Sequence, residues 1–525
     1  MPEYLSPGVY VEELPSGSQP IEGVSTSTAG FLGSTERGPE YANLITSWLD
    51  YQRWYGGYRT TPASYLPYAV QGFFDNGGQR CFVTRIVGAG AGAASNNVGA
   101  LTASAIGRGA WGNNVAVKVR PATQSVAGTP TETWFRVTII YYQTYPSNFV
   151  DPTDPTQLAN KNRKTPDYSE DYDNLTHLPG ASNNVVEMIN GASHLIRVAW
   201  GTNAPAPVPA QDFARLDGGT DPAAGVTPAD FEGDLNAILD ANLFPDEPVG
   251  RGLAALATVD EIALLLAPDE VRSGLGQVSQ DVINLCETLK DRFTIVAAPQ
   301  LPVNATQINV PQDSTYAAYY FPWIYVYDPS QNRTVLIPPT GHVAGIFAKT
   351  DIERGVHKAP ANEVVLGATD LQLPIPKGMQ DILNPKGVNC IRDFRVASRG
   401  IRLWGARTMS STPEWKYVNV RRLFLYVEKS IDHGTQWVVF EPNDEPLWAK
   451  VRRTLTTFLI GVWKSGALMG TTQDEAFFVK CDKETMTQDD IDNGRLICYI
   501  GIAPVKPAEF VIFRISQKTA DAQTT

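Results

Sequence analysis

The chain has 525 residues, and its 44 Gly and 38 Pro predict a turn-rich, mixed or β-rich globular protein of several domains. It carries 43 Lys and Arg against 55 Asp and Glu, and the net charge of −12 argues against nucleic acid as the main partner. No apolar run reaches the roughly eighteen residues of a membrane span, and the first residues lack a secretory signal, so we expect no membrane insertion and folding in the cytoplasm.

Residues 1–20 predict an extended N-terminal arm. Val9, Tyr10 and Val11 lie in a short stretch of alternating apolar residues between prolines, and residues 15–19 follow as a flexible break. A strand that has no hairpin partner beside it in the sequence must pair elsewhere. The arm is therefore a candidate for pairing with another part of the assembly.

Helix and strand patterns alternate in residues 21–100 and again in residues 205–345. This alternation predicts one discontinuous α/β domain with a mainly parallel sheet. Two of the expected helices stop at Gly-Gly pairs, which is a common helix end. We expect strands at residues 28–33, 80–87 and 293–298, and helices at residues 47–55, 64–75, 254–266 and 282–289.

Residues 101–204 follow a different pattern. The runs at residues 115–119 and 134–140 alternate as antiparallel strands do, and polar, Pro-rich loops separate them. We interpret this segment as an inserted β-rich outer domain. The Pro-rich residues 205–209 are the expected exit linker.

Residues 346–503 predict a second α/β or α+β domain, with its clearest helix at residues 446–468. The polar face of this helix carries the basic residues Lys450, Arg453 and Lys464. A basic stripe on an acidic protein is a candidate contact surface, and a solvated helix face is the alternative interpretation. The apolar face of the helix comprises Leu447, Trp448, Val451, Leu455, Phe458, Leu459, Val462 and Trp463.

Residues 504–525 predict a second arm at the opposite end of the chain. After two prolines comes an apolar strand that contains Phe510, Val511, Ile512 and Phe513. One such strand is ordinarily an edge strand of its own domain. Two strands without local partners, at opposite ends, favour exchange between subunits.

The sequence contains no complete motif for catalysis or cofactor binding. The glycines at residues 88–92 follow a strand, but no acidic residue lies between Asp75 and Glu132 to hold a ribose, so a linker is the better interpretation. The run from Asp489 places Ile500 where a calcium loop needs a carboxylate. The cysteines and histidines show no metal-ligand spacing, and no phosphate-binding loop occurs. We expect no catalytic residue, cofactor or metal site, and reduced, mostly buried cysteines.

Longer motifs, most of them in the C-terminal half, resemble the tail sheath proteins of contractile phages and phage-like injection particles. The opening at residues 6–13 (SPGVYVEE) and the end at residues 505–510 (VKPAEF) resemble that family as well. Only the β-rich insert is weakly matched. The C-terminal motifs are residues 319–324 (YYFPWI), 337–345 (IPPTGHVAG), 354–363 (RGVHKAPANE), 404–408 (WGART), 415–423 (WKYVNVRRL) and 434–443 (GTQWVVFEPN), with shorter matches at 383–385 and 387–389.

The resemblance implies a structural subunit that works by polymerising and contracting, without a cofactor. Members of the family form six-subunit rings stacked helically around an inner tube protein, with baseplate and terminal cap proteins as further partners. The extended sheath is metastable, and its contraction drives the tube through a target envelope. Terminal strands of each subunit join a sheet in neighbouring subunits. Such a protein is assembled in the bacterial cytoplasm as a component of a phage tail or a phage-like particle.

The resemblance assigns the exchanged arms to residues 5–13 and 510–515, and the hinges to residues 15–19 and 504–507. The helix at residues 446–468 is the candidate tube-facing element through Lys450, Arg453 and Lys464. Arg421 and Arg422 are the alternative tube contacts.

Three classes of function stay open at this point. A sheath subunit is the reading that the resemblance favours. Another structural tail component, such as a tube or baseplate protein, is the nearest rival, and an enzyme acting on a nucleotide or a sugar comes last. The sequence does not distinguish a phage from a bacteriocin particle or from an extracellular or cell-anchored injection system, with a phage-like injection system slightly preferred.

Overall fold

The computed structural model describes residues 20–58, 64–124, 134–201, 205–223, 225–237, 250–300 and 304–513. Their contacts divide the chain into a larger unit, residues 25–354 and 359–421, and a smaller unit, which takes residues up to Val24, residues 355–358 and the chain from Arg422 onwards. Val9, Tyr10 and Val11 of the predicted N-terminal arm lie outside the described residues.

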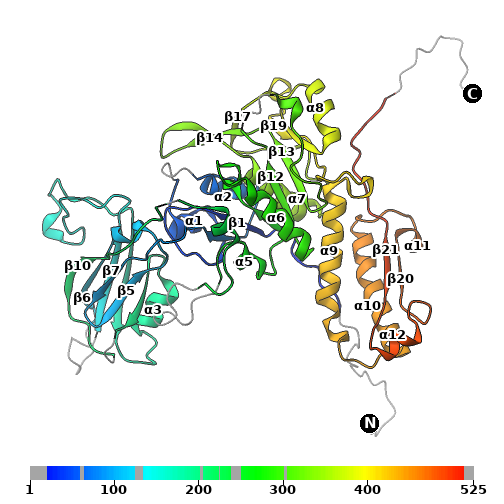
Figure 1. The fold of residues 1–525 in the computed structure, drawn as a ribbon. Coiled ribbons are helices and arrows are strands. Elements are labelled where there is room, and N and C mark those ends of the chain that lie inside the picture. The colour runs from blue at the N-terminus through cyan, green and yellow to red at the C-terminus, as the bar shows by residue number, and fades with distance from the viewer. Residues whose placement is uncertain are drawn as a thin grey trace, which may run out of the picture. The chain divides into compact units, whose positions relative to one another are not determined.

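A nine-stranded sheet forms the centre of the larger unit (Figure 1). The strand order is β16-β19-β18-β13-β12-β11-β1-β3-β2, and the six strands from β18 to β3 run parallel, which confirms the predicted mainly parallel sheet. Antiparallel pairing occurs only towards the two edges. The strands are β1 (Ala29–Gly33), β2 (Asn43–Ile45), β3 (Cys81–Arg85), β11 (Leu264–Leu266), β12 (Phe293–Ala297), β13 (Ala317–Phe321), β16 (Glu363–Val364), β18 (Val388–Asp393) and β19 (Ile401–Leu403).

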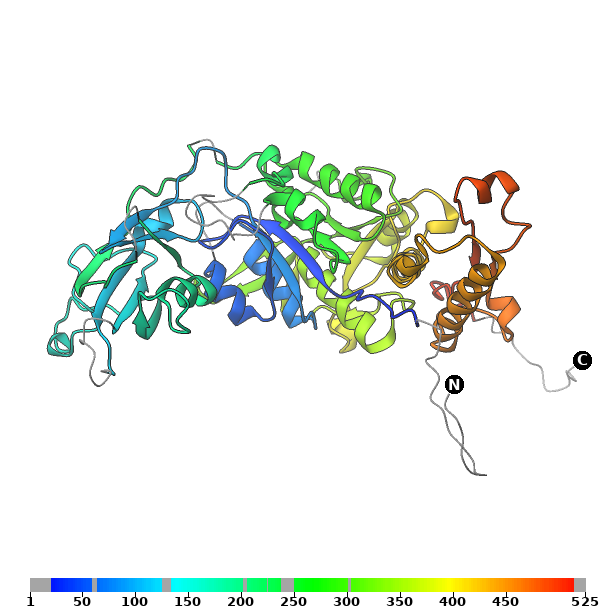
Figure 2. The ribbon, with the colours of Figure 1, turned by 90° about the horizontal axis from the view of Figure 1, so that it is seen from below.

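Helices cover both faces of this sheet (Figure 2). In β1, the Phe31 ring lies 5.5 Å from the Phe73 ring of α2, whereas its neighbour Leu32 belongs to an apolar cluster with residues of α4, α5 and α6. Consecutive strand residues point to opposite faces, so these helices lie on opposite sides. The helices of the larger unit are α1 (Trp48–Tyr55), α2 (Leu66–Asp75), α3 (Val185–Ala192), α4 (Pro228–Glu232), α5 (Gly252–Ala257), α6 (Gly276–Leu289), α7 (Thr340–Arg354) and α8 (Lys377–Leu383).

Helix α7 lies unusually close to α2 because glycines face the contact. A Cβ atom on Gly341 would come 2.1 Å from the carbonyl oxygen of Ala69, and one on Gly345 would come 2.4 Å from that of Phe73. No side chain larger than hydrogen fits at these positions without moving the helix. This is the physical reason for the glycines in the motif at residues 337–345.

One predicted helix is wrong. Residues 254–266 were expected to form a single helix, but α5 ends at Ala257 and the three leucines of β11 form a central strand, all fully buried. A short, uninterrupted apolar run has no periodicity that separates a buried strand from a buried helix. Pairing with β1 on one side and β12 on the other decides the outcome.

Residues 95–215 contribute two antiparallel sheets that share an apolar core, with strand orders β10-β6-β7-β8 and β4-β5-β9. The strands predicted at residues 115–119 and 134–140 are confirmed as β6 and β7, which pair antiparallel. Whether this β-rich region is an outer domain stays a prediction. Its strands are β4 (Ser95–Val98), β5 (Leu101–Ala105), β6 (Val115–Pro121), β7 (Trp134–Tyr141), β8 (Tyr168–Thr176), β9 (Ile196–Trp200) and β10 (Gln211–Arg215), and a further small sheet contains β14 (Ile324–Asp328), β15 (Arg333–Ile337) and β17 (Ala368–Leu371).

Buried charges join the β-rich region to the α/β core. Glu40 is 4% exposed, accepts hydrogen bonds from the backbone N and the Nε of Arg108, each at 3.0 Å, and lies 3.2 Å from Nε of Arg251. The Arg37 guanidinium lies 4.7 Å from the ring centroid of Tyr141 in β7. These contacts link segments that are distant in sequence, so the β-rich region is held against the core rather than loosely tethered.

The smaller unit contains most of α9 and all of α10–α12, together with a two-stranded sheet. Leu423 and Val427 of α9 bury their side chains with Leu459 and Val462 of α10 and with Phe477 of β20. The elements are α9 (Val418–Thr435), α10 (Glu445–Lys464), α11 (Gln473–Ala476), β20 (Phe477–Lys480), α12 (Gln488–Asp492) and β21 (Tyr499–Ile502).

The nine-stranded sheet runs across the predicted division between residues 345 and 346. β16, β18 and β19 come from residues 363–403, yet β18 pairs with β13, and the larger unit extends to Arg421. A boundary at residue 345 therefore does not separate two folded units, because strands on both sides of it share one ladder. The other predicted domain boundaries stay predictions.

We expect Glu40→Gln to lower the free energy of unfolding by about 3 kcal/mol at neutral pH, because it leaves two arginines partly unpaired in a buried site. Burial acts to raise the pKa of Glu40, but the hydrogen bond from Arg108 and the charges of Arg251 and Arg108 outweigh it and hold the pKa below its ordinary 4.5. The stabilisation is therefore present above pH 4.5 and is lost as the pH falls through the lower folded-state pKa.

Urea unfolding at pH 7 and at acidic pH measures this difference. Glu261→Gln is the matched control, because Glu261 forms an exposed ion pair with Arg80 and its loss should change stability by less than about 1 kcal/mol. Equal effects of the two substitutions at pH 7 would contradict the assignment.

Candidate interaction surfaces

The sequence of α10 fixes its start, its end and its buried face. The Asp444 side chain accepts a hydrogen bond from the backbone N of Leu447 at 3.0 Å, and Gly466, with a φ of +83°, follows the last turn. The helix predicted at residues 446–468 is thus confirmed but ends at Lys464. Its buried residues are Leu447, Trp448, Val451, Thr454, Leu455, Phe458, Leu459 and Val462.

The predicted basic stripe lies on the other side of α10. Arg453 and Lys464 are exposed, and neither has an ion pair with any of the described residues. Lys450 is half-buried, and its Nζ lies 4.0 Å from the ring centroid of Trp437. Two of the three basic groups are therefore available to an acidic partner, and the third is partly committed to a cation–π contact. Their role stays a prediction.

Arg421 and Arg422, the alternative contacts, are buried at 5% and 3% exposure. The Arg421 guanidinium lies 4.2 Å from the ring centroid of Tyr316 and 4.8 Å from that of Trp415. Stacking between two rings offsets the cost of burying a charge. Arg421 therefore has a packing role within the chain, and neither arginine is presented on its surface.

The C-terminal segment is fixed at its root and exposed beyond it. The backbone N of Met469 donates to the carbonyl of Ala503 at 2.8 Å, and that of Val505 donates to Ala467 at 3.1 Å. Further along, Phe510, Val511, Ile512 and Phe513 are 70%, 69%, 78% and 83% exposed. In the part of the chain that the structure describes, these four residues belong to no strand and pair with none, so the strand predicted here is not present in the single chain.

The first described residues are held by the same unit. The backbone N of Val24 donates to the Ser430 hydroxyl of α9 at 3.1 Å, and Ile21 packs among side chains of α9 and α10. Sequence reasoning assigned residues 21–24 to the first α/β domain and missed this contact. Ile21, an apolar residue between Pro20 and Glu22, was the available signal.

The two-stranded sheet of β20 and β21 has exposed apolar side chains on one face. Phe478 is paired opposite Gly501, and Lys480 opposite Tyr499, so Phe478 and Tyr499 share that face, at 59% and 57% exposure. Sequence reasoning also missed Phe440, in the loop between α9 and α10, which is fully exposed and has a φ of +68°. These residues add apolar contact area to the smaller unit.

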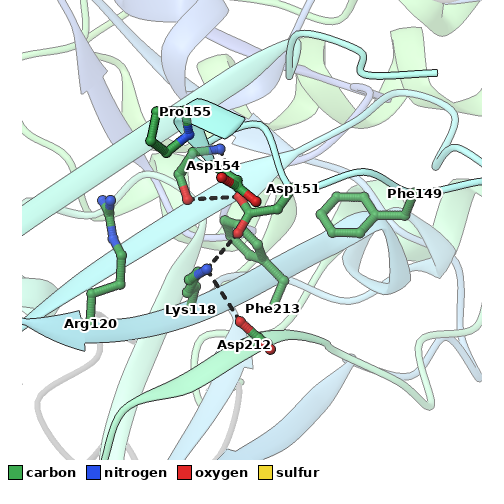
Figure 3. A pocket seen from close by; sticks show the side chains of 9 residues that line it. Lys118, Arg120, Phe149, Asp151, Asp154, Pro155, Asp212 and Phe213 are labelled. Atoms are coloured by element: carbon green, nitrogen blue, oxygen red, sulfur yellow. Dashed lines mark hydrogen bonds and ion pairs between the residues drawn. The ribbon is translucent and has the colours of Figure 1, made fainter. Parts of the chain in front are cut away.

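A pocket of about 650 Å³ lies in the β-rich region (Figure 3). Burial acts to lower the pKa of Lys118, but hydrogen bonds to Asp151 and Asp212 outweigh it and raise this pKa. Burial likewise acts to raise the pKa of Asp151, yet hydrogen bonds from Lys118 and Thr153 lower it. Both groups are therefore held in their charged forms at neutral pH, and neither is poised for proton transfer.

The strongly perturbed carboxyl groups lie in the core of the larger unit. Glu270 is 2% exposed, and burial raises its pKa to about 8. Its neighbour Asp269 is fully buried and accepts hydrogen bonds from the backbone N of Ser34 at 3.0 Å and of Tyr65 at 2.7 Å. These bonds join β1 and the start of α2 to the segment after β11, which is a structural role.

No helix among the described residues has the length and apolar character of a membrane span.

Two family models match adjacent parts of the chain. The phage tail sheath protein central domain matches residues 251–409, and the phage tail sheath C-terminal domain matches residues 410–518. Together they cover residues 251–518, or 268 of 525. The matched regions contain α7, α10 and the two-stranded sheet described above.

Curated relatives agree with the family models. The chain is 26% identical over 227 residues to a tail sheath protein of Vibrio phage KVP40, covering 42% of this chain and 33% of that protein. It is 25% identical over 315 residues to the tail sheath protein of Burkholderia phage BcepMu, covering 54% of this chain and 60% of that protein. The chain thus spans about a third to three fifths of these relatives.

Solved structures extend the likeness in fold to nearly the whole chain. The sheath of the extracellular contractile injection system PVC, in its contracted state, has a TM-score of 0.55 at 22% identity and covers 99% of both chains. The contracted helical sheath of the anti-feeding prophage has a TM-score of 0.56 at 23% identity, covering 98% of this chain and all of that one. With the family models matched over half of its length, the chain belongs to the family of contractile tail sheath proteins.

Proposed function

We propose that this protein is the sheath subunit of a contractile injection machine. Its copies form hexameric rings that stack helically around an inner tube protein, between a baseplate and a terminal cap. Contraction from a metastable extended state drives the tube through a target envelope. The protein is structural rather than catalytic, and the exposed apolar segment of residues 510–513 is the observation that carries the proposal.

That segment becomes a strand only with a partner. Burying an apolar side chain of this size stabilises by about 1.5–3 kcal/mol, so the four exposed residues Phe510, Val511, Ile512 and Phe513 offer on the order of 6–12 kcal/mol before the cost of ordering them. Their unpaired backbone groups add hydrogen bonds when they join a sheet. A neighbouring copy supplies both in a polymer.

The two-stranded sheet of β20 and β21 is the acceptor that the fold offers. A sheet of two strands is marginal by itself, and this one carries exposed Phe478 and Tyr499 on one face. The N-terminal arm, with Val9, Tyr10 and Val11, and the C-terminal strand are the segments that add to it from neighbouring copies. Residues 15–19 and 504–507 are the hinges that let the linked copies move during contraction.

The basic stripe of α10 supplies the contact with the inner tube. The net charge of the protein is −12, so the positive electrostatic potential near Lys450, Arg453 and Lys464 contrasts with the negative charge of the chain as a whole. Exposed charge pairs are weak and screened by salt. Such a contact holds the extended sheath on the tube and breaks readily when contraction begins.

The first experiment tests the arms. Negative-stain electron microscopy of the purified full chain should show hollow, striated tubes, and chains that lack residues 1–19 or residues 510–525 should form none. The chain that lacks residues 510–525 should melt within about 1 °C of the full chain, because residues 510–513 are mostly exposed and add little to the stability of the monomer. Tubes from both truncated chains would overturn the role of the arms.

If the full chain stays monomeric, the proposal is tested by co-expression with the inner tube protein, because a tube can act as the nucleus on which the sheath assembles. Sheathed tubes then support the proposal. Their absence in the presence of the tube and baseplate proteins would overturn it.

The second experiment reverses the charge of the stripe. Lys450→Glu, Arg453→Glu and Lys464→Glu together should abolish extended sheath on the tube, because like charges replace the attraction, while the melting temperature changes little. The matched control is Lys161→Glu, Lys164→Glu and Lys377→Glu, which makes the same change in net charge at exposed positions outside the smaller unit. Normal assembly of the stripe variant would contradict its role, as would equal loss in the control.

A further inference from the structure

Two of the five cysteines face each other across the two-stranded sheet. The ladder between β20 and β21 pairs Val479 with Ile500 and Lys480 with Tyr499. One more step in this antiparallel register places Cys481 directly opposite Cys498. Cys481 and Cys498 are 17 residues apart in the chain, and this spacing alone does not indicate that they pair.

The phase of the ladder gives this pair the spacing that a disulfide needs. The backbone N of Ala503 donates to the carbonyl of Ala476 at 2.9 Å, so these two residues form a hydrogen-bonded pair. Such pairs alternate with non-hydrogen-bonded pairs along an antiparallel ladder, and Cys481 opposite Cys498 falls on a non-hydrogen-bonded position. In an ideal ladder the Cα atoms at such a position lie about 4.5 Å apart, within the roughly 4.4–6.8 Å range of disulfides.

The side chains of the pair are in contact. Both cysteines pack in one apolar cluster with residues of α10, and the interaction between their sulfur atoms shifts the pKa of both thiols. This interaction lowers the pKa of Cys481, and the nearby positive charge of Arg452 acts in the same direction. The same interaction, together with burial, raises the pKa of Cys498, so Cys481 is the first of the two to lose its proton. Cys481 is fully buried, whereas Cys498 is partly exposed and can be reached from solvent.

The remaining cysteines lack these properties. Cys81, Cys286 and Cys390 lie in the larger unit, all three are fully buried, and burial raises the pKa of each thiol. A fully buried thiol is out of reach of a disulfide oxidant in solution, whatever its pKa. These three cysteines therefore serve as internal controls for the pair.

We propose that Cys481 and Cys498 are a redox-active dithiol, which a disulfide oxidant of the glutathione type converts into an intramolecular cross-strand disulfide that joins the end of β20 to the start of β21. The inference goes beyond the proposed function and does not rest on it, because the chemistry belongs to the single chain.

The reaction balances as a two-step exchange. Cys481 loses its proton first, and its thiolate takes the proton of Cys498 as the Cys498 sulfur attacks one sulfur of oxidised glutathione. This step forms a mixed disulfide at Cys498 and releases one glutathione thiolate. Cys481 then loses that proton to solvent, and its thiolate attacks the Cys498 sulfur and displaces the second glutathione. The pair loses two electrons and two protons, and the oxidant becomes two molecules of reduced glutathione.

The disulfide would close a loop that contains residues 482–497 and α12. Closing a loop of this length removes conformations from the unfolded chain and prevents β20 and β21 from separating. The dithiol stays reduced in a cytoplasm buffered by thiols and is oxidised in a compartment that favours disulfides. The sheet is therefore predicted to stiffen when the protein leaves a reducing compartment.

The test uses the reduced full chain, treated with oxidised glutathione and then alkylated under denaturing conditions. We expect two of the five thiols to escape alkylation, a protein mass lower by two hydrogens, and one linked peptide that joins residues 481 and 498. The melting temperature of the oxidised protein should rise by several degrees. Dithiothreitol should reverse all of these changes.

Variants separate the pair from the other thiols. Cys498→Ser and Cys481→Ser should each abolish the linked peptide and the melting shift, and Cys498→Ala provides a second substitution if either serine variant is unstable. Cys390→Ser is the matched control and should leave both intact. The proposal is overturned if all five thiols are alkylated, if a bond forms between two copies or through another cysteine, or if the reaction stops at a glutathione adduct of Cys498.

Discussion

Phe31 and Leu32 are neighbours in β1, and their side chains leave opposite faces of the nine-stranded sheet, one towards α2 and the other towards α4–α6. A parallel sheet of this kind has to be covered on both faces, because its strands are apolar throughout and its connections are helices. The architecture of the larger unit follows from that requirement. Further structure has to enter through loops at strand ends, and the β-rich region accordingly begins after β3 and returns to the sheet before β11.

Sequence patterns predicted the elements that bury a single face, because the apolar residues of such an element recur at a regular spacing. The apolar residues of α10 repeat at helical spacing, so its existence and its basic stripe could be read directly. Leu264–Leu266 carries no period, and only its ladder partners make it a strand. The contact of Ile21 with α9 and α10 joins residues about four hundred positions apart, and Arg421 is buried because two rings happen to flank it. Pairing of Cys481 with Cys498 likewise needs the register of a ladder.

The exposed segment of residues 510–513 places two opposing demands on the chain. In the proposed polymer its four apolar residues drive association, but in the free subunit they are an aggregation hazard, because an unpaired extended segment can pair with any exposed strand. A net charge of −12 opposes unspecific association by mutual repulsion, and prolines at residues 504 and 507 interrupt the segment just before the apolar residues. The free chain is in this way kept apart from its copies without losing the groups that join them.

Residues 20–24 rest on α9, and residues 503–505 are bonded beside the end of α10, so both ends of the described chain leave from the smaller unit. Tension applied between these ends runs through that unit. As long as the contacts of Ile21 and Val24 hold, the nine-stranded sheet carries none of the load. In the proposed polymer, pulling force would therefore pass from copy to copy through the smaller units, and the larger units would move without bearing it.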